Sequence, residues 1–302
     1  MAGPTLAVIR QFLAREAGTF HSGTATGGSS GASSTMIDTV WPFLSSISQN
    51  SLYKDCWLYR SAAAASADKV RIINTYTSST GTVALDNNYT NSPSGEAYEV
   101  HGILEPQTVI PLVINEGLKD CLIPVEFTFT PSSATNTRHS LATDAPWLRD
   151  PSWILKVGYL PSGSQGRGVL DPYWRSGGIR CDSYADGATV YLDNITFNTS
   201  DTVYVYALKP AYYHCAASGG SYGSQSGLSA ETDTVPDTVT VEWAAYAGLM
   251  TGWRRYRANL EANDRVKMSE REAIAKFREW NPNWTDRLPR HARPVRQWGA
   301  VR

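Results

Sequence analysis

The sequence predicts an α+β protein. We expect a helical bundle formed by N-terminal, middle and C-terminal helices, with a small β-module and a larger antiparallel β-sandwich. Apolar residues recur with helical spacing near both ends and over residues 105–120, whereas short alternating segments separated by turn residues fill the intervals. The composition agrees with a fold rich in β-strands, because a content of 18% charged and 11% aromatic residues suits strands and extensive protein contacts.

Residues 1–121 are predicted to form the first domain. A helix over residues 4–18 places Leu6, Ile9 and Leu13 on one face. The Gly, Ser and Thr of residues 22–35 are typical of a flexible linker. Turn residues then separate five short segments that predict a small antiparallel sheet or open barrel, at 36–40, 56–60, 69–76, 81–85 and 97–100. A helix follows over 105–120, with Pro106 suited to its first turn.

Residues 122–229 are predicted to form the β-sandwich, and residues 230–302 a helical domain with a tail. Candidate strands of the sandwich lie at 125–129, 153–159, 178–181, 188–192 and 202–208. Residues 216–229 form a second Gly/Ser-rich segment, either a linker or a long loop. Both Gly/Ser-rich segments are expected to gain order only from a neighbouring subunit. Helices are expected at 237–260 and 269–280, the second opened by a capping box of Ser269 and Glu272.

Motifs for metal, nucleotide or nucleophile chemistry are not apparent. The five histidines are widely separated and the four cysteines form no CxxC pair, so we expect no metal, no cofactor and reduced thiols. The glycine-rich stretch 163–168 lacks the lysine of a phosphate-binding loop and is interpreted as a surface turn. No stretch approaches the ~20 apolar residues of a membrane span, so no membrane partner is expected.

Paired carboxylates are the strongest enzymatic alternative, because glycoside hydrolysis needs two of them across a sugar cleft. Candidate pairs are Glu96 with Glu99, and Asp171 with Asp182 or Asp186. Tyr173 and Trp174 could offer a stacking platform for a sugar ring. A β-rich chain contains such pairs by chance, and a packed loop or a subunit contact is the preferred explanation of the aromatic residues. The sequence therefore favours a protein that is not an enzyme.

The C-terminal end is basic. Residues 251–302 carry thirteen Lys and Arg against six Asp and Glu, which leaves fourteen basic and twenty-two acidic residues in 1–250. Arginines recur every third residue among prolines, a spacing that matches an extended polyproline II arm. Arginine and tryptophan are the usual anchors of protein interfaces. We therefore predict that this arm binds an acidic protein partner, through Trp284, Arg287, Arg290, Arg293, Arg296 and Trp298. The alternatives are contact with nucleic acid, such as DNA in a channel, and a solvated helix face followed by a flexible tail.

The order of these segments resembles a module of the head-to-tail connector (adaptor or neck) proteins of tailed bacteriophages. After the N-terminal helix and the Gly/Ser-rich segment, the likeness rests on short stretches in a fixed order: Thr35–Asp38, Trp57–Tyr59, Val70–Tyr76, Ser79–Val83, Gly95–Glu99, Ile114–Leu118 and Thr232–Asp237. It covers mainly residues 4–120 and 230–280. The β-sandwich is the part least matched.

The resemblance implies a non-enzymatic virion protein at the head–tail junction, assembled in the host cytoplasm. It implies a homo-oligomeric, dodecameric ring that contacts the portal protein on one side and a downstream tail or neck protein on the other, with DNA passing through its channel. It carries over no catalytic residue. The alternative is a virion-associated protein of a tail fibre or baseplate, whose β-sandwich binds carbohydrate.

Overall fold

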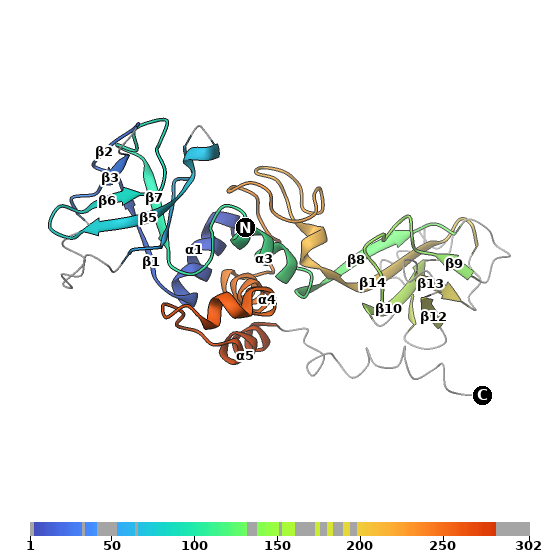
Figure 1. Cartoon of the computed structure of the whole chain (residues 1–302). Helices are drawn as coiled ribbons and strands as arrows, with labels where there is room; N and C mark the ends of the chain where they lie inside the picture. Colours follow the sequence, from blue (N-terminus) through green and yellow to red (C-terminus); the bar gives the residue numbers. More distant parts are fainter. Residues whose placement is uncertain are drawn as a thin grey trace. The chain divides into compact units, whose positions relative to one another are not determined.

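The computed structural model describes residues 3–31, 34–40, 53–63, 66–131, 138–150, 153–160, 173–175, 180–183, 190–193 and 198–281. The chain divides into two compact units (Figure 1). Unit 1 combines residues 1–120 with 215–280, and unit 2 contains residues 121–214. The first boundary lies beside the predicted one. Residues 215–229, which were predicted to lie in the β-sandwich domain, belong to unit 1.

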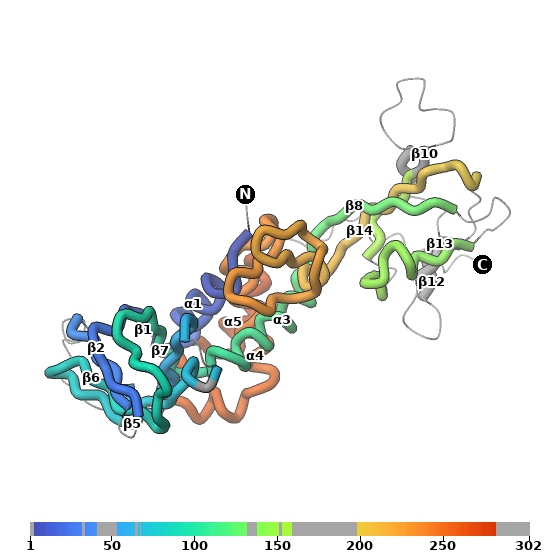
Figure 2. The backbone as a smooth tube through the Cα atoms, turned by 90° about the horizontal axis from the view of Figure 1, so that it is seen from above, coloured from blue at the N-terminus to red at the C-terminus, as the bar shows by residue number. Residues whose placement is uncertain are grey.

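Unit 1 contains a seven-stranded sheet in which all neighbours are antiparallel. The labelled strands β1, β2, β5, β6 and β7 lie together in Figure 2. Alternate side chains of its strands build a buried core that includes Leu58, Ile73, Tyr76, Val83 and Val100. The five strands predicted between residues 36 and 100 are present, with ends shifted by a few residues. In spatial order the strands are β1 (Phe20–Thr24), β7 (Ala97–His101), β4 (Trp57–Tyr59), β5 (Val70–Thr77), β6 (Thr82–Leu85), β3 (Thr35–Ile37) and β2 (Gly27–Ser29).

The prediction of a flexible linker at 22–35 is wrong for the residues that the structure describes. β1 and β2 lie in this segment and pair with β7 and β3. Its glycines permit close packing: a Cβ on Gly28 would lie 2.5 Å from the Pro93 ring and from the Thr35 carbonyl oxygen. The segment lacks the apolar alternation of an ordinary strand. Its order comes from partners distant in the sequence.

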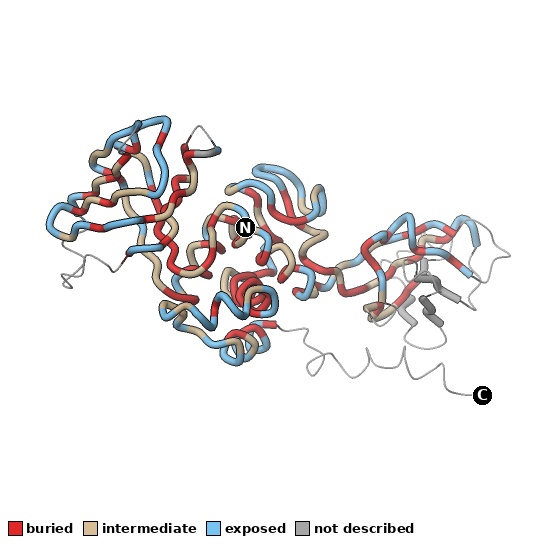
Figure 3. The backbone as a smooth tube through the Cα atoms, viewed as in Figure 1, coloured by how far each residue is buried: buried red, intermediate tan, exposed pale blue. Residues whose placement is uncertain are grey.

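Four helices occur within the described ranges, all in unit 1: α1 (Leu6–Ala17), α3 (Val109–Gly117), α4 (Val241–Glu261) and α5 (Glu270–Trp280). They match the four predicted helices, so the α+β class is confirmed. α4 contacts α1, α3 and α5. Every residue of α4 from Trp243 to Trp253 is buried (Figure 3). A helix that is buried on all sides is central to its unit.

The capping box at the start of α5 is confirmed. The backbone N–H and the hydroxyl of Ser269 donate to Glu272 Oε2 at 2.8 and 2.6 Å. The N–H of Glu272 donates back to Ser269 Oγ at 3.3 Å. These bonds satisfy donors that have no partner inside the helix.

The Gly/Ser-rich segment at 216–229 is a folded loop of unit 1. The Asn115 side chain on α3 donates to the Leu228 carbonyl oxygen at 2.8 Å and accepts from the Leu228 N–H at 2.7 Å. The loop also forms backbone bridges between Cys215 and Gln225 and between Ala216 and Thr234. The expectation that this segment needs a partner subunit for its order is therefore wrong. Contacts within the chain supply the order.

Unit 2 contains two antiparallel sheets. One has the order β11 (Tyr173–Arg175), β10 (Ile154–Leu160), β14 (Thr202–Pro210), β8 (Leu122–Phe129), and the other has the order β12 (Arg180–Ser183), β13 (Val190–Asp193), β9 (Arg138–Ser140). The core includes Phe129, Leu148, Val157 and Val205. The five predicted strands are present. β9 and β11 were not predicted, because Arg138–Ser140 contains no aliphatic residue and Tyr173 and Trp174 were interpreted as part of a packed loop or a sugar platform.

Candidate functional site

A buried charge cluster joins four segments of unit 1. Its centre is Arg10 on α1, whose side chain is only 1% exposed. The guanidinium donates twice to Glu99 on β7, from Nε and Nη2 at 2.9 Å each. Its Nη1 lies 2.5 Å from both carboxylate oxygens of Glu231, in the segment before α4. Tyr59 on β4 completes the cluster, because its hydroxyl donates to Glu231 at 2.6 Å.

Local structure brings these groups together. Arg10 shares the buried face of α1 with Leu6, Ile9 and Leu13, and Thr5 caps that helix by accepting from the Val8 N–H. Glu99 and His101 are two residues apart on β7, so their side chains point to the same face of the sheet. This face meets α1 through the Arg10 side chain.

Glu99 has its acceptor sites filled. Besides the two bonds from Arg10, it accepts from Gln11 Nε2 at 2.7 Å and lies 2.9 Å from His101 Nε2. An ionised carboxylate can only accept hydrogen bonds, so Nε2 of His101 carries the proton in this contact. Arg10 supplies one positive charge to the cluster, and its two carboxylate partners supply two negative charges. The cluster therefore has one excess negative charge when His101 is neutral.

The pKa values follow from burial and these contacts. Burial alone would raise the pKa of Glu99, but the hydrogen bonds and charges of His101 and Arg10 lower it to about 2. Burial alone would lower the pKa of Arg10, yet its bonds to Glu99 and Glu231 raise it above its usual value. Burial raises the pKa of Tyr59, and its bond to Glu231 raises it further. Burial lowers the pKa of His101, and Glu99 only partly offsets this.

A pocket of about 410 Å³ opens beside the cluster. Arg10, Tyr59, Glu99 and Glu231 line it, together with residues of β1. A general acid must release a proton near neutral pH. Glu99, with a pKa of about 2 and every acceptor site filled, does not meet that need. The arrangement instead holds α1, β4, β7 and the segment before α4 together.

The carboxylate pair Glu96 and Glu99, considered in the sequence analysis for glycoside hydrolysis, divides between two arginines. Glu96 accepts from Arg60 Nε at 2.8 Å, whereas Glu99 accepts from Arg10. The two carboxylates therefore pair with different buried arginines, Glu96 with Arg60 and Glu99 with Arg10. Asp171 and Asp186 lie outside the described residues, as does the side chain of Asp182.

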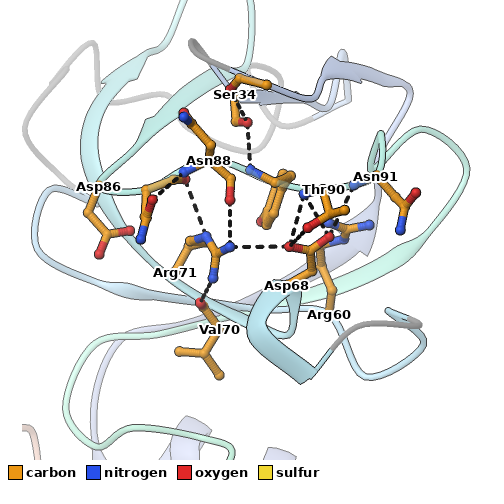
Figure 4. A network of polar contacts seen from close by, with 12 residues as sticks. Ser34, Arg60, Asp68, Val70, Arg71, Asp86, Asn88, Thr90 and Asn91 are labelled. Carbon is orange, nitrogen blue, oxygen red and sulfur yellow. Dashed lines mark hydrogen bonds and ion pairs between the residues drawn. The ribbon is translucent and has the colours of Figure 1, made fainter.

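A second polar network fixes the loop between β6 and β7 (Figure 4). Asp68, in the short 3-10 helix η1 (Ser66–Asp68), accepts from the backbone N–H groups of Thr90 and Asn91 at 2.9 and 3.1 Å. Arg71 on β5 donates to Asp68 at 3.2 Å and to the Asn88 carbonyl oxygen at 2.6 Å. Burial raises the pKa of Asp68, but these N–H donors lower it below its ordinary value. The buried ion pair of Asp68 and Arg71, with its hydrogen bonds, therefore stabilises the conformation of the loop between β6 and β7.

The interface residues predicted from the sequence, from Trp284 to Trp298, lie outside the described residues, so the structure does not place them. The buried cluster was missed. Its one local signal is Arg10, a charge on the apolar face of the predicted N-terminal helix. Its partners follow 49 to 221 residues later, at a spacing that no local pattern reveals.

Three further observations concern metal sites, cysteines and membrane spans in the described part of the chain. Within it, no three His, Cys, Asp or Glu side chains gather in a way that could hold a metal ion. Cys56, Cys121 and Cys215 are buried. None of the helices described is long and apolar enough to cross a membrane. Comparison of this chain with protein-family models, with curated proteins and with solved structures gave no match.

Proposed function

We propose that this protein is a non-enzymatic structural component of a tailed-phage virion, a connector that forms a dodecameric ring between the portal and the tail. The ring would contact the portal protein and a downstream neck or tail protein, and DNA would pass through its channel. In finer detail, we propose that the four helices form a bundle and that the two sheets of unit 2 pack as a sandwich.

One observation carries the proposal. The segments whose order resembles the connector module, residues 4–120 and 230–280, coincide closely with the two stretches that make up unit 1. The long helix after Asp237 returns to contact the N-terminal and middle helices. The intervening unit 2 has its own core, as expected for a segment particular to one protein. The Arg10 cluster supports a structural role for the protein. It holds α1, β4, β7 and the segment before α4 together, and it fills every acceptor site of Glu99, which is therefore unfit as a proton donor.

Ring formation is the first test. We expect the purified protein, alone or mixed with portal protein, to give ring-shaped particles in electron micrographs, with twelvefold class averages. A heterologous interface that closes on itself produces such rings. A protein that stays monomeric at micromolar concentration with portal present would count against the connector. A trimer that binds glycans on an array would support the carbohydrate-binding alternative.

The basic arm is the second test. Deletion of residues 282–302 should leave a folded chain that no longer joins the portal in a DNA-free assembly. An extended arm loses conformational entropy on ordering, so it needs strong anchors such as Arg and Trp. Co-sedimentation with empty portal measures the binding, and circular dichroism checks the fold. As a matched control, Arg254→Gln changes an exposed arginine of α4 and should not affect assembly. Normal assembly of the truncated chain would exclude the docking role.

A further inference from the structure

Backbone bonds beside the charge cluster join the two stretches of the chain that make up unit 1. The N–H groups of Leu6 and Ala7 donate to the carbonyl oxygens of Asp233 and Glu231 at 3.0 and 3.2 Å. The Val235 N–H donates to the Pro4 carbonyl oxygen at 3.1 Å. We call these bonds, together with the side-chain cluster, the clasp. It holds residues 4–17 and 231–235 against each other and against β7.

His101 is a titratable group enclosed beside the clasp, with only 1% of its surface exposed, as little as for Arg10. Its Nε2 faces Glu99, but its Nδ1 is buried with no hydrogen-bond partner in the described part of the chain. The rings of Phe20 and Tyr59 lie edge-on at 5.4 and 6.5 Å. A second proton on this imidazole would need an acceptor at Nδ1, and the surroundings are aromatic.

The charges that face His101 come from each element around it. Glu99 lies beside it on β7 and favours the protonated imidazole, and Glu105 acts in the same direction. Arg10 on α1 opposes protonation. Glu231 is bonded to Arg10 and Tyr59. The buried ring therefore stays neutral while the clasp is closed.

We propose that the clasp is acid-sensitive, and that its opening takes up one proton on His101 and frees α1 and residues 231–235 from β7. While closed, the clasp keeps the imidazole neutral. When α1 moves away, His101 reaches water and binds a proton with an ordinary pKa. The proton thus goes to the open form, and acidification favours opening. This device lies in unit 1 and does not depend on the proposed ring.

The pH window follows from the two pKa values. Because the pKa of His101 is lowered in the closed form, the open form binds more protons below about pH 6.5. The closed form is fully favoured above that pH. Below it, the opening constant rises by up to about tenfold for each pH unit. Glu99, with its pKa of about 2 when closed, adds a second proton only below its ordinary value of 4.5.

Amide hydrogen exchange of the full chain tests the proposal between pH 6.5 and 4.5. After correction for the chemical exchange rate, we expect exchange in peptides covering 3–17 and 228–235 to rise by up to about 100-fold. The variant His101→Gln keeps a donor toward Glu99 but cannot titrate, so its exchange should be flat over this range. His21→Gln, a histidine on β1 outside the clasp, should behave as the wild type in these peptides.

Equal pH dependence in His101→Gln and wild type would overturn the proposal, as would flat exchange in the wild type. Should His101→Gln fail to fold, NMR of the wild-type imidazole gives an independent decision. We expect the His101 ring in the closed protein to titrate below the ordinary midpoint of about 6.5. Titration of His101 with an ordinary midpoint while the clasp amides stay protected would equally exclude the mechanism.

Discussion

Arg10→Met should destabilise the protein by about 3–5 kcal/mol, the usual cost of removing one partner from a buried charge pair. Methionine fills much of the same space but leaves Glu99 and Glu231 without their shared cation. The side chain of Glu99 is only 10% exposed, so water cannot replace the lost bonds without opening the structure. Urea denaturation followed by far-UV circular dichroism measures the change in the free energy of unfolding.

Arg254→Met is the matched control. Arg254 on α4 pairs with Asp120 at 3.1 Å, but both side chains are about half exposed, at 53% and 45%. Exposed pairs contribute at most about 1 kcal/mol, because water and salt screen them. The same substitution should therefore have a several-fold smaller effect. Similar losses for the two variants would show that the buried cluster does not hold unit 1 together.

Gly117→Ala should also be strongly destabilising, by about 1–3 kcal/mol or more. Gly117 ends α3 where that helix meets α4. A Cβ at this position would lie 2.4 Å from the carbonyl carbon of Ala247 and 2.6 Å from its oxygen. These atoms belong to the backbone of a buried helix, so they cannot move aside as a flexible side chain would. The shift in the urea midpoint reports the loss.

Gly252→Ala is expected to act in the opposite direction. Gly252 lies inside α4, and the nearest atom to an added Cβ is Leu104 Cδ1 at 3.5 Å, an ordinary contact. Alanine is favoured over glycine in a helix by up to about 1 kcal/mol. The variant should therefore be as stable as the wild type or slightly more stable. If Gly252→Ala lost as much stability as Gly117→Ala, the close approach of α3 and α4 would not be the cause of the Gly117→Ala effect.

Local patterns in the sequence determined the elements whose signals are contained within a few residues. The capping box of Ser269 and Glu272 predicts the start of α5, because both partners lie in one helical turn. The apolar face of Leu6, Ile9 and Leu13 predicts α1 for the same reason. The alternation in residues 69–76 predicts β5. These patterns were enough to establish the α+β class and the order of the elements.

Tertiary structure decided the remaining features, because their partners are distant in the chain. β1 and β2 form only when Gly/Ser-rich residues meet β7 and β3, so composition alone suggested a linker. Arg10 has no partner close to it in the sequence, and its bond to Glu231 spans 221 positions. The clasp therefore depends on residues 4–17 and 231–235, which belong to the two stretches of unit 1, meeting in space. Burial then makes its charges interdependent and lowers the pKa of His101, a property that belongs to the packed environment and not to the residue type.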